Sequence, residues 1–292
     1  MKLIKQSFEF INQTDFSLVG IKKHIERCAR VSYKSENKIT DTSYEKFVNM
    51  LESRGHDRPL EFGTVYLSRT SQKEDNMEWL DKYAYNPWSK FSFGNGSTRI
   101  NGELRNTVYV TTNYRVIKEH HWEDDLQYLC EPTEYHYKRY TIHMILDRGV
   151  MDEFRTHVGL SHLAESTRYV NYSTNKVCSE IAFIKPCWLD KEKLKLYGPY
   201  HTVIRDKSPE SIFIANLNNV ERDYLDLIKL GWTPQQARSV LPLSIKSELI
   251  SCGFKDSWEN FFYRRDAPDA HPMAQEIAKP MHQKFIELTE MK

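Results

Sequence analysis

The sequence predicts an α+β fold in a single compact domain that spans residues 1–292. Three observations support this. Segments that alternate, or are rich in β-branched and aromatic residues, lie mainly in the first half of the chain. Segments with helical spacing and clear start signals lie mainly in the last third. No internal repeat or low-complexity linker separates the two sets, so we expect them to share one core.

In the first half, two helices are expected before the strands begin, at residues 21–32 and 43–54, and Gly55 ends the second. Strands are then expected at 63–68, at 106–117 with a turn into a helix at its end, and at 137–146. Residues 86–102 mix Asn and Gly with aromatic residues, so we expect a surface loop or lid there.

In the second half, residues 150–163 are expected to form a helix that breaks into a polar loop, and 181–184 a short strand. Ser208-Pro209 matches an N-cap followed by proline at the first helical position, and Gly231 suits the end of that helix. Further helices are expected at 233–241, 256–265 and 272–288.

The composition limits the class of function. The net charge is +1, so no overall field favours nucleic acid or a membrane, and an anionic ligand needs local basic residues. Five cysteines, an odd number without a C-x-x-C pair, argue against a disulfide framework or a zinc site and fit a reducing, cytoplasmic location. We find no signal peptide, membrane-spanning run or metal motif.

Four stretches carry the residues of chemical interest. Residues 161–173 hold six hydroxyl side chains and Arg168, which suits a phosphate site, although composition alone favours a polar loop that caps helix ends. Arg238 lies on an apolar helical turn, where a ligand or a carboxylate partner is possible. Arg264-Arg265 ends an aromatic helix, where it can also compensate the helix dipole, and Arg58 with Glu61 can form a surface pair.

Taken together, these stretches resemble the flavin-dependent thymidylate synthases. Thr156 to Tyr169 (THVGLSHLAESTRY) aligns without gaps with that family's R-H-R-x-x-S-x-N-E-x-S-x-R-Y motif. GWTPQQARSVLP, WENFFYRR with the AHP that follows it, and GHDRPLEFGTVYL resemble three further segments of the family, in the same order. The resemblance covers roughly residues 50 to 290 and implies a mixed or antiparallel sheet flanked by helices.

The resemblance implies roles for individual residues. It implies that Ser166 and Arg168 bind the nucleotide phosphate together with Arg238, and that Ser166 also belongs to the catalytic set. Arg265 is implied as the catalytic residue that holds the pyrimidine and supports its charge, and Glu153 as a further substrate contact. The flavin contacts implied by the resemblance are His157, Asn260, Thr64 and Arg155.

The motif also departs from the family pattern. Thr156 and Val158 stand where the R-H-R triplet has arginines, Leu163 and Ala164 replace Asn and Glu, and Phe62 replaces a His. Arg155, His162 and Glu165 lie one or two positions from the missing groups. Because adjacent helical positions point about 100° apart, they can compensate only if the backbone is shifted or not helical there.

The activity implied by the resemblance is reductive methylation of dUMP to dTMP. Its cofactor is FAD, its co-substrates are NADPH and methylenetetrahydrofolate, and the flavin is expected between subunits of a homotetramer. The altered residues leave other products open, such as a hydroxymethylated or a cytosine nucleotide, and also a nucleotide-binding protein without catalysis. A cysteine-dependent thymidylate synthase is a further alternative, because Pro186-Cys187 faintly resembles its nucleophile context.

Overall fold

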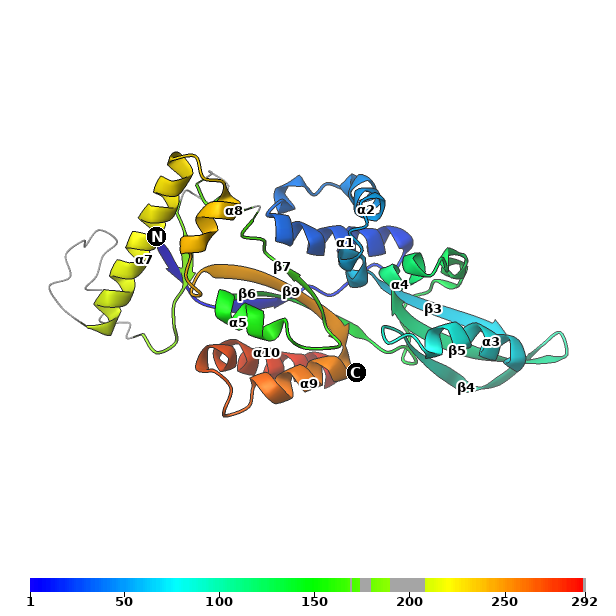
Figure 1. Ribbon diagram of the computed structural model, residues 1–292. Coiled ribbons are helices and arrows are strands. Elements are labelled where there is room, and N and C mark those ends of the chain that lie inside the picture. Colours follow the sequence, from blue (N-terminus) through cyan, green and yellow to red (C-terminus); the bar gives the residue numbers. More distant parts are fainter. Residues whose placement is uncertain (169, 174–179, 190–207, 291–292) are drawn as a thin grey trace.

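The centre of the protein is a four-stranded antiparallel sheet in the order β2-β6-β9-β7 (Figure 1). The computed structural model describes residues 1–168, 170–173, 180–189 and 208–290. The sheet strands are β2 (Ser7–Phe10), β6 (Arg139–Asp147), β9 (Lys246–Phe254) and β7 (Ser161–Ala164). All three strand pairs are antiparallel, so the predicted α+β class with antiparallel strands flanked by helices is confirmed.

Helices cover both faces of this sheet (Figure 1). On one side lie α1 (Leu18–Tyr33) and α2 (Ser43–Ser53), both predicted, and α1 packs against β7 and β9. On the other side lie α9 (Lys255–Arg265) and α10 (Pro272–Glu290), close to their predicted ranges. Each side buries its own apolar core, one around the face of α1 and the other around the aromatic residues of α9, Trp258, Phe261 and Phe262.

A second sheet, in the order β3-β5-β4, extends from the α1 side (Figure 1). Its strands are β3 (Thr64–Ser71), β5 (Glu103–Asn113) and β4 (Lys90–Ile100), covered by α3 (Lys73–Ala84) and followed by α4 (Tyr114–Glu119). The predicted loop at 86–102 is therefore wrong, since β4 fills most of it. Asn101 and Gly102 both have positive φ, 52° and 85°, which makes them the two-residue turn of a hairpin.

The predicted helix at 150–163 is also wrong beyond its first turns. Helix α5 (Arg148–Phe154) begins where the Asp147 carboxylate accepts a hydrogen bond from the Val150 N–H. The chain then forms an irregular segment, residues 155–160, before it enters β7. Gly159 has a φ of 89°, which a right-handed helix does not allow. The backbone of the divergent motif is therefore not helical. This is the condition under which neighbouring residues can compensate for the groups that the motif lacks.

The remaining elements lie at the end of the protein opposite the β3-β5-β4 sheet (Figure 1). Strand β1 (Lys2–Ile4) pairs in parallel with β8 (Ala182–Ile184), which was predicted. Helix α7 (Pro209–Lys229) is capped as predicted, because Ser208 accepts a hydrogen bond from the Ser211 N–H. Helix α8 (Pro234–Ala237) runs into a 3-10 turn at Arg238–Val240. Strands β1, β2 and β9 and helix α3 were not predicted.

Candidate active site

A cavity of about 320 Å³ gathers five arginines beside the end of β7. Two of them, Arg168 and Arg238, were predicted to meet, and they do so together with Ser166. The other three were not predicted as a group with them: Arg58 from the 3-10 turn Arg58–Phe62, and Arg148 and Arg155 from the two ends of α5. The sequence signal for Arg148 was its position directly after a predicted strand.

Short contacts fix the polar loop that forms this cavity. The Ser166 N–H donates to the carbonyl oxygen of Ser32 on α1, at 3.2 Å. Arg168 Nε donates to Gln235 Oε1 at 3.1 Å, and Arg238 Nη1 donates to Thr167 Oγ1 at 3.3 Å. The loop after β7 is therefore joined to α1 and α8, which orients the two arginines toward one space.

The charges around the cavity favour an anion. Arg148 Nε and Arg155 Nη1 share the carboxylate of Asp152, at 3.2 and 3.4 Å. Within the described ranges, no carboxylate oxygen lies within 4.0 Å of the Arg58 or Arg238 guanidinium. Clustered guanidinium groups with adjacent hydroxyls bind phosphate through several charge-assisted hydrogen bonds. The arrangement is therefore suited to a phosphate monoester.

A buried ion cluster supports this loop from the sheet side. Lys246 Nζ lies 2.8 Å from Glu165 Oε2 and 2.5 Å from Glu248 Oε1, and Lys34 and His143 also pair with Glu248. Burial alone would raise the pKa of Glu248, but the His143 hydrogen bond and the two lysines hold it below its usual range. Glu165 is therefore a buried partner of Lys246 that also lines the arginine cavity.

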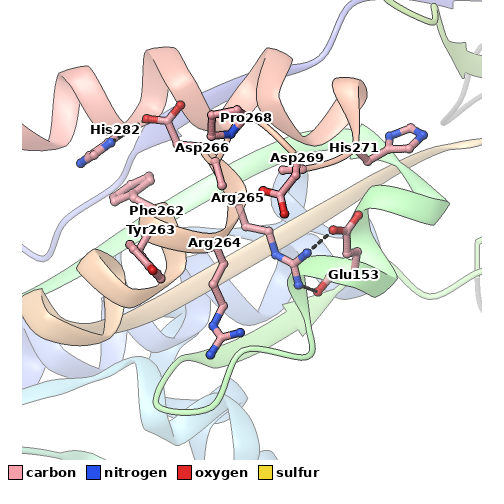
Figure 2. A pocket seen from close by; sticks show the side chains of 12 residues that line it. Glu153, Phe262, Tyr263, Arg264, Arg265, Asp266, Pro268, Asp269, His271 and His282 are labelled. Carbon is pink, nitrogen blue, oxygen red and sulfur yellow. Dashed lines mark hydrogen bonds and ion pairs between the residues drawn. The ribbon is translucent and has the colours of Figure 1, made fainter.

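Arg265 lies in a different pocket, of about 780 Å³, at the end of α9 (Figure 2). Its Nη1 forms a close ion pair with Glu153, and its Nη2 donates to the Glu153 carbonyl oxygen at 3.0 Å. Its Nε donates to His157 Nε2 at 2.6 Å. Burial, and then the charge of Arg265, lower the pKa of His157 to about 4, so the imidazole is a neutral acceptor. Within one chain, Arg265 does not share a cavity with Arg168 and Arg238.

A third cavity, of about 400 Å³, adjoins the arginine cavity and is lined by the first part of the divergent motif, within residues 156–162. His157, Arg155 and Ser161 line it, and Arg58, Arg155 and His162 line both cavities. Two of the expected flavin contacts, Arg155 and His157, therefore line the same cavity. The buried Ser161 hydroxyl has no hydrogen-bond partner in the described structure, which is consistent with a ligand site.

Two other expected flavin contacts lie apart from this cavity. Thr64 is buried, and its hydroxyl accepts a hydrogen bond from Arg139 Nη1 at 3.2 Å. Asn260 is exposed on α9. Neither residue lines the three cavities above. A contact with a flavin would require a different ligand position or a neighbouring copy of the chain. Tyr169, the last residue of the motif, lies outside the described residues.

The suggested surface pair between Arg58 and Glu61 is wrong. Glu61 forms a close ion pair with Arg115, which also approaches Glu119 at 3.1 Å. The Glu61 carbonyl oxygen accepts a hydrogen bond from Arg139 Nη2 at 2.9 Å. Arg58 is left exposed toward the two adjoining cavities.

Cys28, Cys130, Cys187 and Cys252 are free thiols. Burial raises the pKa of Cys187, which disfavours the thiolate that a cysteine nucleophile requires. Across the described residues, no cluster of three His, Cys, Asp or Glu side chains forms a metal site, and no helix is long and apolar enough to cross a membrane.

The family model described as thymidylate synthase complementing protein matches residues 96–289, so the chain belongs to this family. Similar solved structures include two crystal structures of the UMP/dUMP methylase PolB from Streptomyces cacaoi, with 5-Br UMP and with 5-Br dUMP. They are 14% and 15% identical to this chain, each with a TM-score of 0.41. Each covers 99% of this chain, and the matches cover 92% and 93% of the PolB chains. The comparison with curated proteins gave no match.

Proposed function

We propose that the protein transfers a one-carbon group to C5 of a uracil deoxynucleotide, converting dUMP to dTMP in the manner of a flavin-dependent thymidylate synthase. The observation that carries this proposal is the arginine cavity at the end of β7. It gathers Ser166, Arg168 and Arg238, which are the residues expected to bind the nucleotide phosphate from the family motif. The family membership of the chain supports the same reading.

In this proposal, the phosphate of dUMP is bound by Arg168, Arg238 and the Ser166 hydroxyl. These contacts lie away from the reacting carbon, so they provide binding energy that positions the pyrimidine ring. The hydrogen bonds that join Arg168 to Gln235 and Arg238 to Thr167 hold both guanidiniums in place before the ligand arrives. Less side-chain freedom then remains to be lost on binding.

Arg265 has the second task, which is to balance negative charge on the pyrimidine as C5 becomes nucleophilic. Glu153 and His157 fix its guanidinium, and the neutral His157 ring accepts the Nε hydrogen. Since Arg265 lies in a separate pocket of the same chain, the site requires a neighbouring copy to bring an Arg265 to the phosphate cavity. In this proposal the ligands therefore lie between subunits of the expected homotetramer.

The cavity beside the phosphate site is proposed to hold FAD. Its position next to the arginine cavity, its guanidiniums and the unpartnered Ser161 hydroxyl suit a phosphate-containing, hydrogen-bonding ligand. Bound FAD would supply the hydride that completes the methyl group, with NADPH as reductant and methylenetetrahydrofolate as the carbon source. The protein's part is to hold these ligands in register and to exclude water.

One observation favours a second candidate, an enzyme of the same family with a different C5 product. Val158 replaces an arginine of the family motif, and its side chain is 89% exposed. An apolar, solvent-facing residue at that position cannot supply the hydrogen bonds of an arginine. A change on the flavin side with an intact phosphate site would alter the product more than the nucleotide affinity.

The purified protein tests these proposals directly. A flavin absorbance band that bleaches on addition of NADPH, followed by dTMP from dUMP and methylenetetrahydrofolate, would support the thymidylate synthase. Another C5-modified nucleotide, identified by product mass, would support the second candidate. Tight dUMP binding without any flavin, even after incubation with FAD, would instead indicate a nucleotide-binding protein without catalysis.

A further inference from the structure

We propose that Glu165, together with Ser32, binds a hydroxyl group of the nucleotide sugar and thereby selects the sugar of the substrate. This inference rests on the proposed function, because it refines the nucleotide site in the arginine cavity. The evidence is a pair of buried polar atoms in residues that line this cavity, one an acceptor and the other a donor. Neither atom has a hydrogen-bond partner among the residues that the structure describes.

Glu165 lines the cavity directly before Ser166, which is proposed to bind the phosphate. It is 2% exposed, and its backbone N–H donates to the Glu248 carbonyl oxygen at 2.8 Å. Lys246 Nζ lies 2.8 Å from Glu165 Oε2, and Lys34 Nζ lies 4.0 Å from the same oxygen. The other carboxylate oxygen, Oε1, is buried and has no partner in the described part of the chain. Lysines therefore hold one oxygen of the carboxylate, and the second can accept a hydrogen bond from a ligand.

Ser32, in the last turn of α1, lines the same cavity. Its carbonyl oxygen accepts a hydrogen bond from the Ser166 N–H at 3.2 Å, so the loop that carries Glu165 is joined to α1 here. The buried Ser32 hydroxyl has no partner within the described residues, and it does not bond to Glu165. A ligand group that donates and accepts at the same time would satisfy both side chains.

The chemistry of these two groups favours a hydroxyl over a phosphate. A phosphate offers mainly acceptor oxygens near neutral pH, and its negative charge is repelled by a carboxylate. A sugar hydroxyl can donate to Glu165 Oε1 and accept from the Ser32 hydroxyl. In a nucleoside monophosphate, the 3′-hydroxyl is separated from the phosphate only by the sugar carbons and one ester oxygen. Both groups therefore fit the one cavity, of about 320 Å³, in which Arg168 and Arg238 are proposed to bind the phosphate.

A role as partner of Lys246 alone does not explain why residue 165 is a carboxylate. Lys246 also pairs with Glu248 at 2.5 Å, and Lys34 and His143 pair with Glu248 as well. The charge of Lys246 is thus balanced without Glu165, and burying a second carboxylate adds a desolvation cost. A contact with the substrate accounts for this buried charge, because a site built to bind a hydroxyl rejects ligands that lack it.

The experiment measures by calorimetry how three nucleotides bind to the full chain. They are dUMP, UMP and 2′,3′-dideoxyuridine 5′-monophosphate, which has no free sugar hydroxyl. The variant is Glu165→Met, which keeps the side-chain length and leaves Lys246 paired with Glu248. Glu221→Met is the matched control. Glu221 pairs with the terminal amino group at 2.6 Å, this group keeps Glu180 at 3.4 Å, and Glu221 lines none of the cavities described above.

We expect the unmodified protein to bind dUMP about tenfold or more tightly than the dideoxy nucleotide, and Glu165→Met to reduce this preference to about threefold or less. Glu221→Met should keep the full preference. A purely structural role of Glu165 would instead weaken both nucleotides equally and leave the preference intact. Tighter binding of UMP than of the other two, lost in Glu165→Met, would also support the site and identify the 2′-hydroxyl as its ligand.

Equal binding of all three nucleotides to the unmodified protein, or a preference that Glu165→Met leaves unchanged, would overturn the inference. The proposed function would still stand in that case, because dUMP binds. If circular dichroism shows that Glu165→Met does not fold, Ser32→Ala takes its place. This variant removes only the donor and should also lower the preference, so an unchanged preference would again overturn the inference. Unmodified protein that binds none of the three nucleotides would overturn both the inference and the proposed function.

Discussion

Replacing Lys246 by methionine tests how the sheet supports the phosphate loop. Lys246 Nζ pairs with Glu165 at 2.8 Å and with Glu248 at 2.5 Å, and both carboxylates are buried, with side chains 1% and 9% exposed. In Lys246→Met, Lys34 still pairs with Glu248, but its Nζ lies 4.0 Å from Glu165. Glu165 would thus lose its close cation, and a buried charge without a partner costs about 3–5 kcal/mol.

The assay is urea unfolding of Lys246→Met and of the unmodified protein at pH 7.5, followed by circular dichroism. Lys255→Met is the control, because Lys255 forms an exposed pair with Glu259 at 3.6 Å, and such pairs contribute at most about 1 kcal/mol. We expect a loss of about 3–5 kcal/mol in Lys246→Met, part of which the added change Glu165→Gln recovers. A loss no larger than that of the control would refute the reasoning.

Three further predictions concern binding, turnover and pH. Arg168→Ala should weaken dUMP binding by about 1.5–3 kcal/mol, roughly 10- to 150-fold by calorimetry, and unchanged affinity would rule out its phosphate role. Arg265→Ala should keep its circular dichroism spectrum and lose turnover, so normal turnover would contradict its role. Burial lowers the pKa of His24 to about 3 and that of His162 to about 4. Because the unfolded chain takes up these protons below about pH 6.5, each should cost about 1.4 kcal/mol of stability per pH unit from there down toward the lowered pKa. Equal urea stability at pH 7.5 and 5.5 would contradict this.

Local signals in the sequence were sufficient for much of the fold. The Ser208-Pro209 cap and the helix at residues 21–32 depend on neighbouring residues, and both were predicted. Strand β9 was missed because nearly all of it is buried, so it shows no alternation, and Ser, Glu, Cys and Gly interrupt its apolar residues. Gly253 in β9 leaves room for Leu160, since a Cβ there would lie 2.5 Å from Leu160 Cδ2. This contact forms only in the tertiary structure, and no local sequence pattern indicates it.

The candidate site likewise has contacts that the sequence predicts and contacts that it does not. The meeting of Ser166, Arg168 and Arg238 could be predicted because each belongs to a recognisable segment. The partner of Glu61 could not, because Arg115 lies far along the chain whereas Arg58 is close in sequence. Both Glu165 and Arg58 line the arginine cavity, but Glu165 is buried and paired with Lys246, whereas Arg58 is exposed. Sequence spacing does not reveal that difference.

A crystal structure of the protein with dUMP would test the central claim most directly. The proposal predicts the phosphate of dUMP between Arg168, Arg238 and Ser166, with an Arg265 guanidinium at the pyrimidine ring, supplied by a neighbouring copy. A nucleotide bound elsewhere, or an assembly in which no Arg265 of any copy reaches the phosphate cavity, would contradict it.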